Sequence, residues 1–334
     1  MKIVLVHDDL VQWGGAERVL EGLCEIYPDA PIYTSVYDVN NEELAKRFKN
    51  KKIITSFLQK IPFWKSLYKA LLPLYPIAFE QFDFTGYDLV ISHTTRFAKS
   101  VITKPGTLHV CYCHTPPRFL WHFSGYKSFG LGEILMTKLR LLDQVSAKRV
   151  DFFLAGSENA KKRIKRVYGV DSKVIYPFID LDRFRNTEAF DGGYYVVMGR
   201  PNKYKRFDLA IEACKKLGIE LKILDGKFSD DMVVNILAGC KALIIPGEED
   251  FGLASLEAQA LGKPVIAFKA GGALETVTSK TGLFFEEQTV DCLVQAINKL
   301  QDTKIDSQDC RQNAAKFSKE TFKKSFQHAL ADMV

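Results

Sequence analysis

Along most of the 334 residues, short apolar runs alternate with amphipathic stretches. Strands of a parallel sheet that is buried on both faces give such runs, and the helices that cover the sheet give the amphipathic stretches. The strands predicted for the first half lie at 2–8, 31–37, 87–94, 107–115, 151–157 and 173–177. A second series begins at 194–200, after the Gly-rich and polar segment TEAFDGG. The pattern therefore predicts two α/β domains, each with a doubly wound parallel sheet.

The composition, 47% apolar and 26% charged residues, is ordinary for a globular protein. No apolar run approaches the roughly 18 residues that a transmembrane helix needs. The first segment, MKIVLVHDDL, turns acidic where a signal peptide would continue. We therefore expect the chain to be cytoplasmic and peripheral at the inner face of the membrane. Its seven scattered cysteines favour reduced thiols over disulfides.

Charge is distributed unevenly along the chain. Residues 1–185 hold 27 of the 46 basic and 19 of the 40 acidic side chains, a net charge of +8, and the remainder has a net charge of −2. The first half is therefore expected to meet an anionic partner. No zinc-finger spacing, RNP-like motif or basic heptad region indicates nucleic acid, which leaves an anionic membrane surface or an anionic acceptor.

The stretch at residues 46–75 is basic and aromatic. It carries eight Lys or Arg residues and no acidic one, and apolar side chains recur every three or four positions from Phe57 to Tyr75. Pro62 and Pro73 predict a helix of about 11 residues between them, long enough to lie in a membrane interface. Three lysines flank the apolar stripe: Lys60, Lys65 and Lys69. Packing of this helix on its own domain is the alternative.

Residues 244–267, IIPGEEDFGLASLEAQALGKPVIA, predict a strand, an acidic loop, a helix and a second strand. Glu257 shares a helical stripe with Leu253 and Leu261, so its carboxylate requires hydrogen-bond donors. A ligand could supply these donors, or an internal Arg or Lys. Glu249 precedes the helix, so two carboxylates could bind different parts of one molecule.

The start of this predicted helix has unpaired backbone N–H groups, which favour an anion such as phosphate. The amides belong to Phe251, Gly252 and Leu253. Carboxylates that accept from hydroxyls, next to amides that hold phosphate, suggest a nucleotide sugar as the ligand.

The segment resembles the signature of the retaining glycosyltransferases of family 4. That signature is Glu, seven residues and Glu, with Phe-Gly after the first acid and a Gly-x-Pro-Val-Ile strand after the second, as in Glu249, Glu257 and residues 262–266 here. The resemblance implies the GT-B fold, in which two Rossmann-like domains face a cleft. It implies that Glu249 contacts the donor sugar and that Glu257 contacts the ribose hydroxyls.

The resemblance also implies the division of the chain. Residues 1–185 would bind the acceptor, residues 186–316 would bind the nucleotide sugar, and the helix at 317–334 would return to the first domain. The second domain looks shortened, because about one βα unit of the family pattern is missing after residue 226. The missing turn normally borders the nucleobase.

Further residues match the family. Gly199-Arg200 with Lys205 matches a pattern whose two cations stabilise the leaving diphosphate, so no metal and no cofactor are expected. In the family, a glycine pair in the loop after the first strand approaches the donor phosphates, and a His at a Pro-fixed loop lies beside the hexose. These correspond to Gly14, Gly15 and, in HTPPRFLW, His114, with His93 a weaker candidate; Gly271, Gly272 and Glu275 match a later motif.

Two segments superficially resemble metal sites. Cys111, Cys113 and His114 lack a fourth ligand nearby, so packing is the preferred interpretation. Asp180 and Asp182 lie where the family has its interdomain linker, and we interpret them as a hinge.

The resemblance thus predicts a metal-independent, retaining transfer of a hexose from a GDP- or UDP-linked donor to a glycan or lipid-linked acceptor. Details of the sequence motifs favour the mannosyltransferases of surface-polysaccharide assembly. A nucleotide-sugar epimerase of the same architecture and a non-catalytic partner subunit remain as alternatives.

Overall fold

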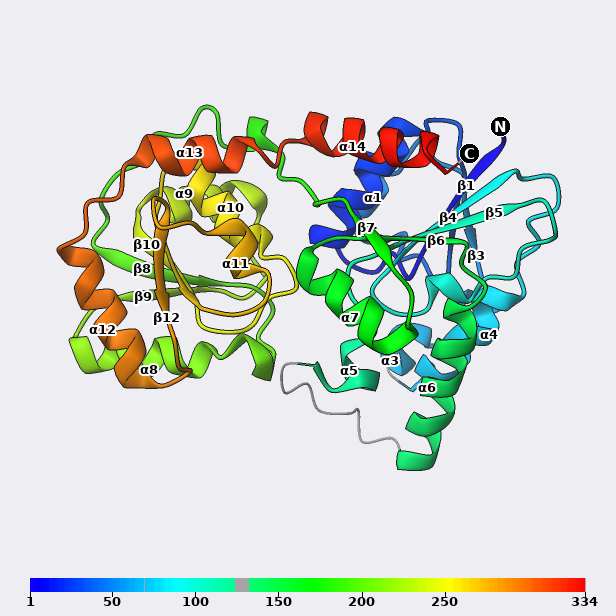
Figure 1. Ribbon diagram of the computed structural model, residues 1–334, viewed down its shortest axis with the longest axis horizontal. Coiled ribbons are helices and arrows are strands. Elements are labelled where there is room, and N and C mark those ends of the chain that lie inside the picture. Colours follow the sequence, from blue (N-terminus) through cyan, green and yellow to red (C-terminus); the bar gives the residue numbers. More distant parts are fainter. Residues whose placement is uncertain (69, 124–131, 334) are drawn as a thin grey trace. The chain divides into compact units, whose positions relative to one another are not determined.

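The structure, a computed structural model, describes residues 1–68, 70–123 and 132–333. The chain folds into two compact units (Figure 1). The first unit comprises Met1–Ile175 and the chain from Lys323 onward, and the second comprises Tyr176–Phe322. Each unit contains one parallel sheet and its own apolar core.

The first unit has a seven-stranded sheet in the order β3-β2-β1-β4-β5-β6-β7, with every pair parallel. Six of its strands overlap predicted runs, whereas β3 does not. The strands are β1 (Ile3–His7), β2 (Ile32–Thr34), β3 (Ile53–Thr55), β4 (Leu89–Thr94), β5 (Leu108–Cys113), β6 (Phe152–Ala155) and β7 (Ser172–Val174). Its helices are α1 (Gly15–Ile26), α2 (Glu42–Arg47), α3 (Trp64–Leu67), α4 (Tyr75–Glu80), α5 (Arg118–Trp121), α6 (Glu133–Ala147) and α7 (Glu158–Tyr168). The predicted start of a helix at Gly130 lies outside the described residues.

The core of the first unit follows from the alternation of strand side chains. Val4, Val6 and Val90 point to one face of the sheet, where Phe79 of α4 and Leu139 of α6 cover them. All five side chains are almost completely buried. Burying an aliphatic or aromatic side chain of this size contributes about 1.5–3 kcal/mol.

The basic, aromatic stretch at residues 46–75 differs from its prediction. Phe63 has the left-handed φ of 57°, α3 is only four residues long, and Pro73 lies in a short 3₁₀ turn, Leu72–Leu74. The expected helix of about 11 residues is therefore wrong for the described part of this stretch. Instead, the chain forms consecutive short turns, and the apolar stripe packs against the core of its own domain. The residues of the stripe are Phe57, Ile61, Trp64, Tyr68, Leu71 and Tyr75. Lys69 lies outside the described residues.

The second unit has a five-stranded sheet in the order β12-β11-β10-β8-β9, again with every pair parallel. The strands are β8 (Tyr194–Met198), β9 (Leu221–Leu224), β10 (Cys240–Ile245), β11 (Val265–Phe268) and β12 (Gly282–Phe285). Its helices are α8 (Phe207–Leu217), α9 (Asp230–Ala238), α10 (Leu253–Ala260), α11 (Ala273–Thr276), α12 (Val290–Gln301) and α13 (Ser307–Ala315). Helices α8 and α12 cover one face of the sheet, and α9 and α10 cover the other.

The boundary between the units falls earlier than 185/186, where the sequence placed it. Residues after Ile175 already pack in the second unit: Tyr176 stacks on Phe251 with ring centroids 5.4 Å apart, and Ile179 is buried with Leu256. Asp180 and Asp182, interpreted from sequence as a hinge, thus lie within the second unit.

Helix α14 (Lys319–Ala331) leads from the second unit into the first. Its Phe326 is buried against Tyr112, and Lys323 Nζ lies 2.5 Å from Glu25 Oε2 of α1. The return of the last helix to the first domain, expected from the resemblance, therefore has a structural counterpart from Lys323 onward. Among the described residues, no helix is both long enough and apolar enough to cross a membrane.

Candidate functional site

In both sheets the order of strands reverses at one point, and open α/β sheets bind ligands outside the carboxyl ends of the strands at such a point. In the second unit the reversal lies between β8 and β10, because β9 follows on one side and β11 on the other. Strand β8 leads directly to Gly199 and Arg200, and β10 leads to Glu249. Three of the predicted residues therefore come from the two strands at the reversal.

Lys205 and Glu249 form an ion pair at this edge. Lys205 Nζ lies 2.5 Å from Glu249 Oε1, and each side chain is 14% exposed. Gly199 has a φ of 135°, and a Cβ there would lie 3.2 Å from Nζ and Cε of Lys205. The glycine is thus needed both for its backbone conformation and for the close passage of the lysine. Arg200 is exposed and forms no ion pair with the described residues.

The loop that carries Glu249 is held by backbone contacts. The Gly272 amide donates to the Glu249 carbonyl at 2.9 Å, and a side chain at Gly272 would overlap the backbone of Phe251. Gly252 precedes α10 with a left-handed φ of 99°, and no side chain caps this helix start. Ser255 fixes the turn by donating to the Gly252 carbonyl at 2.6 Å. The predicted anion-binding amides therefore open α10 from a rigid turn.

Glu257 has the internal basic partner that the sequence left open. Arg183 Nη1 donates to Glu257 Oε1 at 2.9 Å, and the two side chains are 12% and 14% exposed. A second carboxylate, that of Asp230, lies 3.3 Å from Arg183 Nη2. No hydrogen bond reaches Glu257 Oε2 from the residues that the structure describes. One oxygen is thus anchored inside the unit by Arg183.

In the first unit the reversal lies between β1 and β4. The carboxyl ends of these strands and of β5 place three histidines side by side. His93 Nδ1 lies 2.9 Å from His7 Nδ1, and His93 Nε2 lies 2.7 Å from His114 Nε2. On the other side of its ring, His7 Nε2 lies 3.7 Å from Glu17 Oε1 of α1. His93 and His114, the two histidines that the sequence suggested for the sugar site, thus belong to one continuous series of side-chain contacts.

The environments of the two buried rings differ. Burial lowers the pKa of His7, but the carboxylates of Glu17, Asp8 and Asp9 together outweigh this effect and raise the pKa above its ordinary value. For His93, burial and then the neighbouring His114 and His7 hold the pKa well below its ordinary value. A positive charge is therefore favoured on His7 and disfavoured on His93.

Asp8 fixes the loop that follows β4. Its carboxylate accepts from the amides of Thr95, Phe97 and Ala98 at 2.7–2.9 Å and from the Thr94 hydroxyl at 2.8 Å. Burial alone would raise the pKa of Asp8, but Arg96, His7 and these amides hold it below its usual range. The edge at β1 and β4 is therefore rigid.

The predicted glycine pair lies at the same edge. Gly14 is extended at the N-cap of α1, and Gly15 is the first residue of that helix. Any residue adopts the φ of −163° found at Gly14, so its backbone conformation does not require glycine. The role of the pair towards phosphates stays a prediction.

Three residues that contribute to these edges were missed by the sequence reasoning: His7, Glu17 and Arg183. A signal for His7 was present, because three predicted strands each have a histidine as their second-last residue, at VHD, SHT and CHT. Glu17 and Arg183 had no comparable signal. Their roles depend on which strand and helix ends lie together.

The segments that resemble metal sites have other roles. Cys111 and Cys113 are buried in an apolar cluster with Phe153. Asp180 accepts from the Asp182 amide at 3.2 Å and so caps its own turn. Within the described ranges, no group of three or more His, Cys, Asp or Glu side chains is arranged to hold a metal ion.

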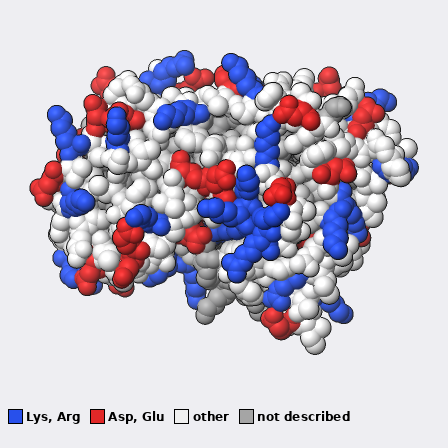
Figure 2. All heavy atoms as spheres, in the orientation of Figure 1, with Lys and Arg blue, Asp and Glu red and all other residues white. Residues whose placement is uncertain are grey.

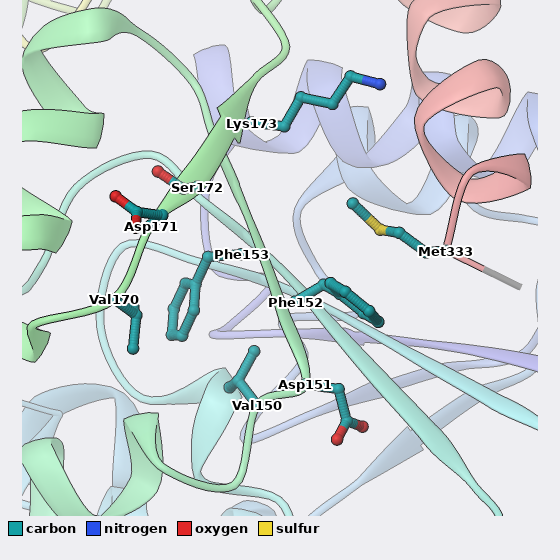
Figure 3. A pocket seen from close by; sticks show the side chains of 9 residues that line it. All are labelled: Val150, Asp151, Phe152, Phe153, Val170, Asp171, Ser172, Lys173 and Met333. Atoms are coloured by element: carbon teal, nitrogen blue, oxygen red, sulfur yellow. The ribbon is translucent and has the colours of Figure 1, made fainter.

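A pocket of about 310 Å³ lies elsewhere in the first unit (Figure 3). Its walls come from the amino-terminal ends of β6 and β7 and from the end of the chain: Val150, Asp151, Phe152, Val170, Ser172 and Met333. Since ligands of such sheets bind at the carboxyl ends of the strands, this pocket is not a donor site.

Basic side chains gather over α7 (Figure 2). Lys162, Lys165 and Arg166 are exposed there, and Lys165 pairs with Asp171 at 3.0 Å. The opposite side of the helix is buried through Arg163 and Ile164. The run is therefore the solvated face of an amphipathic helix.

Two family models match the chain. The model described as Glycosyltransferase Family 4 matches residues 13–183, and the model described as Glycosyl transferases group 1 matches residues 223–317.

Individual proteins are similar at low identity. An alpha-1,3/1,6-mannosyltransferase, ALG2, of Kluyveromyces lactis is 23% identical over an alignment that covers 83% of this chain and 71% of the relative. A GDP-mannose-dependent monoacylated alpha-(1-6)-phosphatidylinositol monomannoside mannosyltransferase of Corynebacterium glutamicum is 39% identical over 24% of this chain and 23% of its own length. The structure of Anabaena HepE in complex with UDP and glucose is 19% identical with a TM-score of 0.70, covering 99% of both chains. The fold is the GT-B fold that the sequence predicted.

Proposed function

Because the chain belongs to glycosyltransferase family 4, we propose that it transfers a hexose, mannose, from a nucleoside-diphosphate sugar to a glycan or lipid-linked acceptor with retention of configuration. The observation that carries this proposal is the pairing of Lys205 with Glu249 beside the exposed Arg200 at the reversal of the second sheet. One edge would thus offer cations to a diphosphate and a carboxylate to sugar hydroxyls.

In this proposal Arg200 and Lys205 stabilise the charge that develops on the leaving diphosphate. Preorganised cations act in this way without rearranging during the reaction. The first amides of α10 would hold a phosphate oxygen, since a helix start attracts anions. They belong to Phe251, Gly252 and Leu253. Gly14 and Gly15 of the first unit would leave room for the phosphates, and no metal takes part.

The two carboxylates have different tasks. Glu249, held by Lys205, would orient the hexose, and His114 would line the sugar pocket. Glu257 would accept from a ribose hydroxyl through Oε2, while Arg183 holds Oε1. No carboxylate is assigned as a nucleophile, so we propose a same-face reaction in which the leaving phosphate takes the acceptor proton.

The choice of mannose rests on the names of two relatives, both mannosyltransferases, one of which is GDP-mannose-dependent. A structural neighbour binds UDP and glucose, so the panel of donors must include UDP sugars as well as GDP sugars.

The test is a thermal-shift panel of GDP- and UDP-linked hexoses, followed by a transfer assay with glycan and lipid-linked acceptors. One donor should raise the melting temperature and yield a glycoside with the anomeric configuration of the donor. A free isomerised donor made without acceptor would instead identify an epimerase. If the protein binds no nucleotide and no nucleotide sugar, the result would favour the alternative that it is a non-catalytic partner subunit.

We also propose reversible docking on an anionic membrane through part of residues 46–75. After the stripe has packed on the core, Phe63 remains 83% exposed and Leu67 42% exposed, next to the exposed Lys60. Each basic residue near an anionic leaflet contributes up to about 1 kcal/mol, and buried apolar area adds to it.

Salt-sensitive binding to vesicles rich in anionic lipid should weaken in Phe63→Ser and in Lys60→Glu. Ile102→Ser, which changes another exposed apolar side chain of the same unit, serves as the control. If the wild-type protein does not bind anionic vesicles at low salt, this docking is ruled out.

A further inference from the structure

The contacts of His114 with the interior of the first unit carry an inference about how this ring is protonated. Strands β1, β4 and β5 are neighbours in the sheet, and His7 is paired in register with His93 (Figure 1). His114 follows the end of β5, and its amide donates to the Thr94 carbonyl at 3.0 Å. The four side chains Glu17, His7, His93 and His114 are thereby lined up from the buried interior towards a half-buried ring.

The two contacts of His93 use different nitrogens of its ring. His93 meets His7 through Nδ1 and meets His114 through Nε2. Each nitrogen–nitrogen contact holds one proton, because two N–H groups would repel and two lone pairs would leave buried acceptors unpaired. The proton positions in the three rings are therefore coupled to one another.

With Glu17 ionised, one neutral arrangement satisfies these contacts, and one added proton could place the charge on His7, His93 or His114. The carboxylate beside His7 favours the arrangement in which His7 is charged. In the neutral arrangement, His114 Nε2–H donates to His93, His93 Nδ1–H donates to His7, and His7 Nε2–H points to Glu17. In the charged arrangement, His7 carries both protons, His93 donates through Nε2–H, and His114 carries its proton on Nδ1. His114 is uncharged in both arrangements, but its proton has moved from one nitrogen to the other.

The charge of the second arrangement belongs on His7. Glu17 of α1 lies 3.7 Å from its Nε2, and Asp8 and Asp9 follow it on the loop after β1. These three carboxylates outweigh the effect of burial, so the pKa of His7 lies above its ordinary value.

The middle ring has no comparable stabilisation. His93 is completely buried, and it faces His7, His114 and the ring of Tyr112 on β5, whose centroid is 5.6 Å away. No carboxylate among the described residues contributes to its pKa, which lies well below the ordinary value. A positive charge on His93 is therefore disfavoured.

We propose that Glu17, His7, His93 and His114 form a proton relay that sets the tautomer of His114. A proton from solvent forms a bond to His114 Nδ1, and the Nε2–H bond of the same ring breaks. His93 gains this proton on Nε2 and loses its own from Nδ1 to His7 Nδ1. One proton has entered, and the positive charge comes to rest on His7 beside Glu17.

The relay makes His114 a hydrogen-bond donor through Nδ1 when His7 is charged and an acceptor when His7 is neutral. If His114 contacts the donor sugar, the KM for the donor should depend on pH with the midpoint of His7. This consequence rests on the proposed function, whereas the protonation of the relay can be measured without substrate.

The test uses the whole protein labelled with ¹⁵N in histidine and long-range ¹H–¹⁵N spectra from about pH 5 to 9, where histidines titrate. We expect His93 to stay neutral throughout. His7 should lose one proton as the pH rises, and the proton of His114 should move from Nδ1 to Nε2 at the same midpoint.

The deciding variant is Glu17→Gln, which changes the end of the relay opposite His114. Removing an opposite charge next to His7 should lower the common midpoint by about one pH unit or more. Glu21→Gln, which removes a carboxylate from the same helix where it pairs with Arg47, should leave the midpoint unchanged.

Two results would overturn the relay. One is a midpoint in well-folded Glu17→Gln equal to that of the wild type. The other needs only wild-type protein and so decides the matter even if the variant does not fold: a charged His93, or a His114 that becomes an imidazolium with a midpoint of its own. A relay seen by NMR together with a pH-independent KM would instead count against the sugar contact of His114.

Discussion

Replacing Glu257 by Gln tests whether one carboxylate can serve the fold and the ligand together. The change removes the charge that faces Arg183 at 2.9 Å but keeps an oxygen in nearly the same place. Arg183 would keep Asp230 at 3.3 Å, and its Nε is buried without a hydrogen-bond partner in the described structure. The loss of Glu257 would therefore leave a cation that is poorly satisfied.

The magnitude follows from the burial of the pair. Removing one partner of a fully buried ion pair costs about 3–5 kcal/mol, whereas an exposed pair contributes about 0–1 kcal/mol. With side chains 12% and 14% exposed and a second carboxylate nearby, we expect a loss of about 1–2 kcal/mol. For a unit of this size, that loss corresponds to a decrease in Tm of roughly 3–6 °C.

The assay is a double-mutant cycle with Glu257→Gln, Arg183→Met and the double variant. The loss of stability in the double variant should be smaller than the sum of the single losses by about 1 kcal/mol. Nucleotide affinity, measured by calorimetry, should fall at least about tenfold in Glu257→Gln, because a hydrogen bond to a charged group is lost. Glu212→Gln, an exposed position on α8, is the control for the loss of one negative charge.

Two outcomes would refute this reasoning in different ways. An unchanged Tm with lost nucleotide binding would mean that the pair with Arg183 contributes nothing to the free protein. A decreased Tm with unchanged nucleotide affinity would restrict Glu257 to the ion pair and remove it from the ribose site.

Three further predictions concern the chemistry and the stability of the chain. Lys205→Ala should lower kcat by about 10²–10³, whereas Lys203→Ala in the same turn should not, and an unchanged kcat at saturating donor would remove Lys205 from the leaving-group site. EDTA should leave the transfer rate unchanged, and a loss that Mn²⁺ or Mg²⁺ restores would contradict metal-independent transfer. Burial lowers the pKa of His109 to about 4, so the unfolded chain binds a proton first as the pH falls below about 6.5. The wild type should thereby lose up to about 3 kcal/mol more than His109→Gln between about pH 6.5 and 4, and equal slopes in denaturant unfolding would show that this histidine does not contribute.

Local patterns predicted the elements that hold the site. The strands of both sheets produce continuous apolar runs, because they are covered on both faces, and glycines and caps mark where the helices begin and end. The motif around Glu249 and Glu257 also lies within one strand, loop and helix. Its residue spacing, together with the resemblance to family 4, was therefore sufficient to predict the fold, whereas the donor-binding role of these residues stays a prediction.

The helix expected between Pro62 and Pro73 shows where a local pattern was insufficient. The periodic apolar positions indicated an amphipathic surface correctly, but they did not indicate which surface would cover it. The core beneath residues 46–75 is built by β1, β4, α4 and α6, and the stripe follows that surface in short turns. Tertiary packing therefore overrode the local preference for a continuous helix.

By itself, the sequence determined which residue types lie at the ends of strands and at the starts of helices. Only the tertiary structure decided which of those ends meet. The contacts of Lys205 with Glu249 and of Arg183 with Glu257 join residues 44 and 74 positions apart, and that of His7 with His93 joins residues 86 apart. Such contacts depend on the order of strands within each sheet, which is set by the packing of whole layers, whereas hydrophobic periodicity reports only on the neighbours of each residue along the chain.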